Sequence, residues 1–221
     1  NSPQYDNGDI FSVSLWIKTS SATFGGLVTK QAGSGNYRGW GLYVNPTGSG
    51  EFGVQMYHAL GSNQINLETT NNGWNDGNWH HVCLTYDGSS TAAGVKIAVD
   101  GVNQAITVNA DSLSNSFTNT TAMSIGSRGL ANAFYNGRVD EVSLYSATLT
   151  SAQITELYNA GKPRNAMGLS TSGSLDAYYR CGDLTFDSKA GGQATVFDRS
   201  ANLYNLWQAN MEQADFAEDT P

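Results

Sequence analysis

Residues 79–89 read WHHVCLTYDGS, and residues 95–101 read VKIAVDG. The alternating apolar positions of these two stretches are Val82, Leu84, Tyr86, Val95, Ile97 and Val99. Alternation over a short run predicts a β-strand with one buried face. The Asp-Gly pair that ends the second stretch favours a tight hairpin turn. We therefore predict a hairpin in which Val95–Val99 pairs directly with Gln104–Val108.

The same period-two pattern recurs along the first part of the chain. Further alternating stretches are Phe11–Ile17, Trp40–Val44, Phe52–Met56 and Met123–Ile125. Clusters of Gly, Asn, Asp and Ser separate these stretches, which is typical of turns. Short strands divided by such turns indicate an all-β fold, an antiparallel two-sheet jelly-roll sandwich.

One segment has helical spacing instead. In residues 151–160, the apolar side chains of Ile154, Leu157 and Tyr158 follow one face of a helix. Thr150 or Ser151 is a candidate N-cap at its start, and a Gly and a Pro follow the segment. We predict one short helix near 151–160 that covers one end of the sandwich.

Composition excludes several classes of partner. Only 14% of the 221 residues are charged, and the net charge is −8. Because Lys and Arg do not cluster, we expect no nucleic-acid partner. No apolar run approaches the roughly 18 residues that span a bilayer, so we expect no membrane insertion. The chain begins at Asn1, and we interpret it as a processed piece of a longer protein.

We expect residues 1–221 to form a single domain. Residues 165–174 are small and polar, which indicates a connector. The β-like stretch that follows, 175–210, is too short for a core of its own, so we expect these late strands to complete the sandwich. Cys83 and Cys181 both lie in expected strands, and we predict buried free thiols rather than a disulfide.

Two long stretches together resemble a known family. The run WHHVCLTYDGS ahead of VKIAVDG is similar to a motif of laminin-G-like domains in the concanavalin A-like lectin/glucanase superfamily. So is the later run FYNGRVDEVSLYSATLTSAQITELYNAG at residues 134–161. The resemblance covers about residues 10–162 and implies a jelly-roll fold.

The late segments depart from the order of that family. Residues 177–183 (AYYRCGD) and 198–202 (DRSAN) resemble pieces that precede the first strand in many relatives, whereas here they come last. We interpret this order as a permuted jelly roll, in which the late strand takes the sheet position of the early one. The alternative is the start of a second, truncated domain. The late strand also resembles domains of tailed-phage structural proteins.

The resemblance raises the question of glycanase activity, because the superfamily contains glycanases. These enzymes need two cooperating carboxyl groups, which jelly-roll glucanases carry on one strand as E-x-D-x-x-E. None of the six Glu residues forms that motif, and Asp140 and Glu141 are adjacent, so on a strand they point to opposite faces. There is no G-x-S-x-G elbow either. We predict that the protein is not an enzyme.

The resemblance also implies a structural calcium site. In laminin-G-like relatives a calcium ion often ties the D-x-S-G-N loop to the Asp of the D-E-V strand. The matching residues here are Asp198, Asn202 and Asp140, and Asp183 at the end of YYRCGD is a candidate fourth ligand. Such oxygen ligands suit Ca²⁺. The alternative is that these Asp residues cap turns by accepting backbone N–H bonds.

Aromatic residues suggest a second candidate site. Sugar rings stack on exposed aromatic faces, and polar side chains bind their hydroxyl groups. We select as candidate ligand-binding residues Tyr37, Arg38, Trp40, Tyr57 and Trp74. The alternative for each aromatic residue is packing between the sheets.

These patterns together favour a non-catalytic binding or adhesion module for glycans or cell-surface ligands, located outside the cell. The alternative is a structural domain at the virion surface, such as a fibre, spike or decoration protein. That domain would act through assembly with other virion proteins or as a homo-oligomer.

Overall fold

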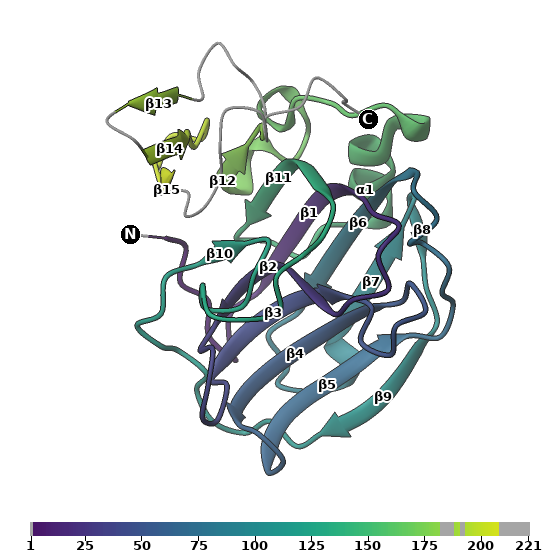
Figure 1. Cartoon of the computed structure of the whole chain (residues 1–221), viewed down its shortest axis with the longest axis vertical. Helices are drawn as coiled ribbons and strands as arrows, with labels where there is room; N and C mark the ends of the chain where they lie inside the picture. The colour runs from purple at the N-terminus through teal and green to yellow at the C-terminus, as the bar shows by residue number, and fades with distance from the viewer. Residues whose placement is uncertain (1, 182–187, 191–192, 208–221) are drawn as a thin grey trace.

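The computed structural model describes residues 2–181, 188–190 and 193–207. Two six-stranded antiparallel sheets pack face to face (Figure 1), which confirms the predicted all-β sandwich. Sheet A contains, in spatial order, β12 (Leu175–Tyr179), β11 (Arg138–Tyr145), β1 (Phe11–Lys18), β6 (Trp79–Tyr86), β7 (Val95–Val99) and β8 (Val102–Asn103). Sheet B contains β10 (Ser124–Ile125), β2 (Gly25–Gln31), β3 (Gly39–Val44), β4 (Phe52–Ala59), β5 (Asn63–Thr69) and β9 (Ile106–Asp111).

The alternating apolar residues of both sheets meet in one core. From sheet A, Leu84 and Ile97 are fully buried, and from sheet B, Leu42 and Val54 are fully buried with them. The strands form because burying one face of each sheet removes these side chains from water. The residues between them in sequence point to the two outer faces of the sandwich.

The hairpin predicted after β7 is correct at its turn and wrong in its length. Asp100 and Gly101 both have positive φ, 50° and 79°, as a tight hairpin turn requires. However, on the side away from β6, β7 pairs only with the two residues of β8, and the next strand, β9, pairs with β5 in the other sheet. The alternating pattern of β9 fits the edge of either sheet, so the sequence pattern did not distinguish them.

The predicted helix forms as α1 (Ser151–Tyr158). Thr150 and Gln153 build a reciprocal capping box at its start. Ile154 and Leu157 pack on the outer face of sheet A, so the helix covers a sheet face rather than an end of the sandwich. Short 3₁₀ turns are η1 (Ala92–Gly94), η2 (Asn159–Gly161), η3 (Ala166–Gly168) and η4 (Ser172–Ser174). None of the helices in the described residues is long and apolar enough to cross a membrane.

The late segment divides between two sheets. β12 pairs with β11 and extends sheet A at its edge. The remaining strands, β13 (Ser188–Ala190), β14 (Gln193–Val196) and β15 (Leu206–Trp207), form a separate three-stranded sheet beside it (Figure 1). The expectation that all of 175–210 completes the sandwich is therefore wrong beyond β12. Val196 nevertheless belongs to the main core, which joins the small sheet to the sandwich.

Cys83 and Cys181 are not joined by a disulfide, as predicted, but only the first is buried as expected. Cys83 is buried on the outer face of sheet A beneath α1, and burial raises the pKa of its thiol to about 12. Cys181 is half-buried.

Candidate functional site

The outer face of sheet B carries a continuous group of polar and aromatic side chains. Register places Gln55 of β4 opposite Gly41 on one side and Asn66 on the other. In the same way Gly39 lies between Gln31 and Tyr57. Two glycines therefore stand at the middle of this face, and larger side chains surround them.

Tyr43 fills the space that the glycines leave. A Cβ atom at Gly41 would lie 2.6 Å from the Tyr43 ring, so the ring lies directly over that glycine. The Tyr43 hydroxyl donates a hydrogen bond to Oε1 of Gln31. Burial raises the pKa of Tyr43, and it raises the pKa of Tyr57 to about 12. Both phenols are therefore neutral hydrogen-bonding groups at physiological pH.

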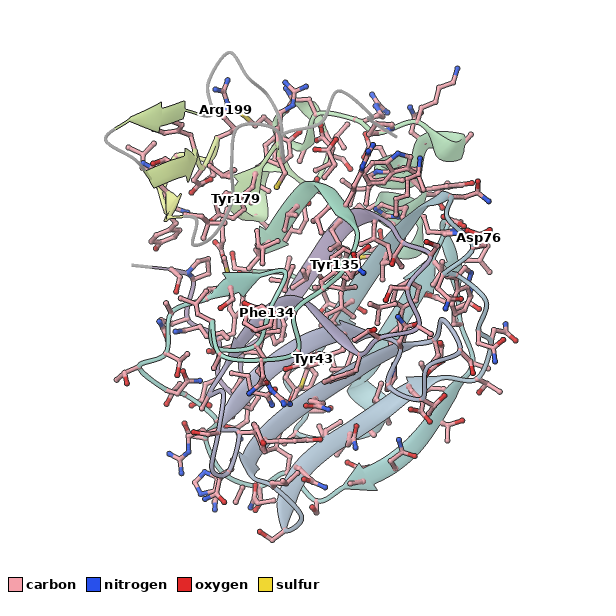
Figure 2. All side chains as sticks on the ribbon, in the orientation of Figure 1. Tyr43, Asp76, Phe134, Tyr135, Tyr179 and Arg199 are labelled. Carbon is pink, nitrogen blue, oxygen red and sulfur yellow. The ribbon has the colours of Figure 1, made fainter. Side chains whose placement is uncertain are left out.

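A loop formed by residues 126–137 crosses this face after β10 (Figure 1). The N–H of Gly26 donates to the carbonyl of Ala133 at 2.8 Å, and the Thr29 hydroxyl donates to the carbonyl of Ser127 at 2.8 Å. The loop also presents Phe134, which is 59% exposed (Figure 2). It covers β2.

The loop holds Arg128 over the aromatic side chains of the face. The guanidinium carbon lies 4.2 Å from the centre of the Tyr37 ring and 5.8 Å from that of Phe24. Nε donates to Oδ1 of Asn132 at 2.8 Å. The positive charge opposes the rise in the pKa of Tyr43, which places Arg128 beside the Tyr43 hydroxyl. We call Gln31, Tyr37, Tyr43, Gln55, Tyr57 and Arg128 the outer-face cluster.

Two polar atoms of the outer-face cluster are buried without a partner. These are Nε2 of Gln31 and Oε1 of Gln55. A buried polar atom without a hydrogen bond costs about 1–3 kcal/mol. A ligand that supplied an acceptor to Gln31 and a donor to Gln55 would remove that cost.

The five predicted ligand-binding residues separate in the structure. Tyr37 and Tyr57 belong to the outer-face cluster. Trp40 is 1% exposed and packs on Phe11 inside the core, with ring centres 5.1 Å apart, so its assignment as ligand-facing is wrong. It takes the inward position because it alternates in phase with Leu42 and Val44.

The other two predicted residues make contacts outside the outer-face cluster. Trp74 is half-buried and stacks on the core residue Phe52, with ring centres 5.3 Å apart. Arg38 is directed to the neighbouring His58, with Nη2 3.1 Å from its Nε2. Sequence reasoning missed Gln31, Tyr43, Gln55 and Arg128. Of these, Tyr43 and Gln55 stand out of phase with the apolar residues of their strands, which is a detectable signal.

The carboxylate of Asp198 is saturated with hydrogen bonds. Oδ1 accepts from the backbone N–H groups of Tyr178 at 2.9 Å and Ser200 at 2.8 Å. Oδ2 accepts from the Ser200 hydroxyl and the N–H of Tyr204, both at 2.8 Å. Four donors occupy the roughly four lone-pair positions of a carboxylate. These contacts match the turn-capping role that was the alternative to calcium.

The remaining predicted calcium ligands do not converge on Asp198 in the described residues. Asp198 forms an isolated β-bridge with Tyr179 of β12. Asp140 lies on β11, which pairs with the opposite edge of β12. Two strand spacings are roughly 10 Å, too far for short carboxylates that must each reach an ion within about 2.6 Å. The Asn202 amide donates to the backbone carbonyl of Asp176 at 2.8 Å. Asp183 lies outside the described residues, and no group of three or more metal-binding side chains occurs within them.

The adjacent acids Asp140 and Glu141 lie at an irregularity in the pairing of β11 with β1. Glu141 has a positive φ of 51° there. Its carboxylate accepts a hydrogen bond from the Tyr178 hydroxyl and one from Nε of Arg180 at 3.2 Å. These bonds tie the extra edge strand β12 to β11.

Comparison with known proteins gives both a family and a set of similar folds. The laminin-G-type family model of the concanavalin A-like lectin/glucanases superfamily matches residues 1–155. The adhesion G-protein coupled receptor V1 of Danio rerio is 27% identical over 159 residues, which are 67% of this chain and 2% of the receptor. The chain therefore spans a very small part of that relative.

Solved structures share the fold at low sequence identity. A protein of Bacteroides ovatus for which carbohydrate binding has been suggested has a TM-score of 0.62 and 16% identity, covering 91% of this chain and 52% of its own. The CBM40 of the Ruminococcus gnavus IT-sialidase, bound to α2,3-sialyllactose, has a TM-score of 0.50 and 16% identity, covering 68% of this chain and 83% of its own. The resemblance of the late strand to phage structural proteins gains no support from these comparisons.

Proposed function

This chain belongs to the concanavalin A-like lectin/glucanases superfamily, and from that membership we propose that it is a non-catalytic, extracellular module that binds glycans through the outer face of sheet B. The observation that carries the proposal is the pair of buried, unpartnered amide atoms on Gln31 and Gln55. A glycan offers hydroxyl groups that both donate and accept, which is the chemistry that these two atoms lack.

The composition of the face supports binding without catalysis. The four strands β2 to β5 contain one carboxylate, that of Glu68. Hydrolysis of a glycosidic bond by the usual route needs two carboxyl groups on either side of the bond. Aromatic side chains and amides are instead suited to hold a sugar in place.

The relatives agree with this proposal at the level of broad function. A carbohydrate-binding module bound to sialyllactose shares the fold, and an adhesion receptor shares part of the sequence. Both are proteins of binding or adhesion, and the receptor relative supports a location outside the cell.

The proposal can be tested with a glycan array followed by calorimetry on the glycans that bind. Because a neutral hydrogen bond contributes about 0.5–1.5 kcal/mol, Gln55→Ala and Tyr57→Phe should each weaken binding by about two- to tenfold. Gln4→Ala and Tyr158→Phe are matched controls away from the face and should bind as the parent does. An array without specific glycans, or equal affinity in all four variants, would contradict the proposal.

A further inference from the structure

We propose that the glycan bound by the outer-face cluster carries a carboxylate group, and that Arg128 binds that carboxylate. This inference rests on the proposed function and adds the chemical class of the ligand. It starts from the only positively charged member of the outer-face cluster.

Arg128 has no anionic partner among the described residues. Its contacts there are the Asn132 amide oxygen, the rings of Tyr37 and Phe24 and the Tyr43 hydroxyl. By contrast, Arg180 lies 3.2 Å from a carboxylate oxygen of Glu141, and Arg164 lies 3.9 Å from one of Glu156. A half-buried cation held by neutral groups has no ion pair to break when an anion binds.

The geometry leaves the guanidinium ready to form paired hydrogen bonds. Nε is bonded to Asn132, and the ring of Tyr37 supports the guanidinium from the side at 4.2 Å. A guanidinium fixed in this way is pre-organised for a planar, two-oxygen acceptor. A carboxylate is such an acceptor, and its bonds to Arg are stronger than those of a neutral hydroxyl.

The Tyr43 hydroxyl links Arg128 to Gln31. The Tyr43 hydroxyl donates to Gln31 and also lies next to the Arg128 guanidinium, so the two side chains share a neighbour. The unpartnered atom of Gln31 is its Nε2, which is a donor. Arg128 is half-buried and is the charged donor of the cluster that suits a carboxylate, whereas the unpartnered acceptor Oε1 of Gln55 suits a sugar hydroxyl.

The net negative charge of the protein disfavours the approach of an acidic ligand, so recognition of an acid depends on the local contact with Arg128. With a net charge of −8, the chain repels anions at long range. Selectivity for an acid must then come from contact with Arg128 itself. Such a contact loses strength as salt screens the charge.

The test combines a change in the ligand with a change in the protein. The probes are sialyllactose and trigalacturonate, each beside its methyl ester, which has the same shape without the charge, and lactose as a neutral reference. Of the two acids, the one that binds should have an affinity about tenfold or more higher than that of its methyl ester. This is the difference expected when a charge-assisted hydrogen bond is lost. Arg128→Gln should cause the same loss with the acid and no further loss with the ester.

The controls separate this inference from the proposed function. Arg164→Gln removes a guanidinium on the opposite side of the sandwich and should leave both affinities unchanged. Equal binding of acid and ester by the parent protein would overturn the carboxylate inference whether or not Arg128→Gln folds. If lactose binds as tightly as the acids and Gln55→Ala weakens it, glycan binding stands and the inference fails. If no glycan binds, both fail.

Discussion

Oδ2 of Asp100 lies 2.8 Å from Nδ1 of His80, across the turn that ends β7. The other oxygen of that carboxylate accepts the backbone N–H of His81 at 2.9 Å. Nε2 of His80 lies 3.1 Å from Oδ1 of Asp76, so its ring stands between two carboxylates. The hydrogen bond to Asp100 is the main reason why the pKa of His80 is raised. His81 points the other way and is buried, which lowers its pKa to about 4.

His80→Gln should destabilise the protein more at low pH than at high pH. Because the folded pKa of His80 lies above the unfolded value of 6.5, its stabilisation is complete below pH 6.5 and is lost as the pH rises through the folded pKa. The expected loss at pH 5.5 is about 0.5–1 kcal/mol, since the groups are partly exposed. Urea unfolding of both proteins at pH 5.5 and 8.5 measures it. A difference that grows with pH would contradict this assignment.

His81→Gln should remove a pH dependence of stability whose sign is opposite to that caused by His80. The unfolded His81 takes up a proton near pH 6.5, whereas the folded one resists it down to about pH 4, so the parent loses stability as the pH falls between these values. The loss is on the order of 3 kcal/mol. Gln can keep the bond that Nε2 of His81 now makes with the Ser14 hydroxyl at 2.8 Å. Unfolding measured at pH 7.0 and 4.5 should show a smaller difference in the variant.

Gly41→Ala should weaken glycan binding without touching a ligand directly. The added methyl group would lie 2.6 Å from the Tyr43 ring and push it off the face, which also moves the hydroxyl that contacts Gln31. Crowding of this kind costs about 1–3 kcal/mol of stability. Gly168→Ala is the matched control, because its added methyl group meets nothing within 4 Å. Unchanged affinity in Gly41→Ala would show that the position of Tyr43 does not matter for binding.

Trp40→Ala should lower stability by about 3–5 kcal/mol, because it opens a cavity in the core. Its indole packs against Phe11 and Tyr5, with ring centres 5.1 Å and 6.0 Å away. Trp74→Ala should cost less, since that side chain is half-buried. Denaturant unfolding compares the two. Glycan affinity per folded molecule should be preserved in Trp40→Ala, and a selective loss of binding with unchanged stability would restore Trp40 as a ligand contact.

Asp198→Ala should cost about 3 kcal/mol or more, because it leaves buried donors of Tyr178, Ser200 and Tyr204 unpaired. Asp87→Ala is the control, because its exposed carboxylate accepts from Ser89 in a surface turn. Since the Asp198 lone pairs are occupied, we expect EDTA to leave the melting temperature of the parent unchanged. A melting temperature that falls with EDTA and recovers with Ca²⁺ would instead establish the calcium site that the family resemblance implies.

Local patterns in the sequence determined the strands, the helix and the turns. The alternation of Val82, Leu84 and Tyr86 depends only on the two-residue period of a strand, and the cap of α1 depends only on Thr150 and Gln153. The tight turn at Asp100 and Gly101 follows from residues that accept positive φ. These features were predictable because each is decided by neighbours in the chain.

Tertiary structure alone decided the pairing of β9 and the outer-face cluster. Ile106–Asp111 fits either sheet edge by its own pattern, and the free edge of β5 takes it. Arg128 meets Tyr37 across about ninety residues of chain, because the 126–137 loop folds back over β2. Alternation tells which residues share a face of one strand. Only the packing of distant strands and loops decides whether that face is core, as at Trp40, or a surface where unpartnered polar atoms meet, as at Gln31 and Gln55.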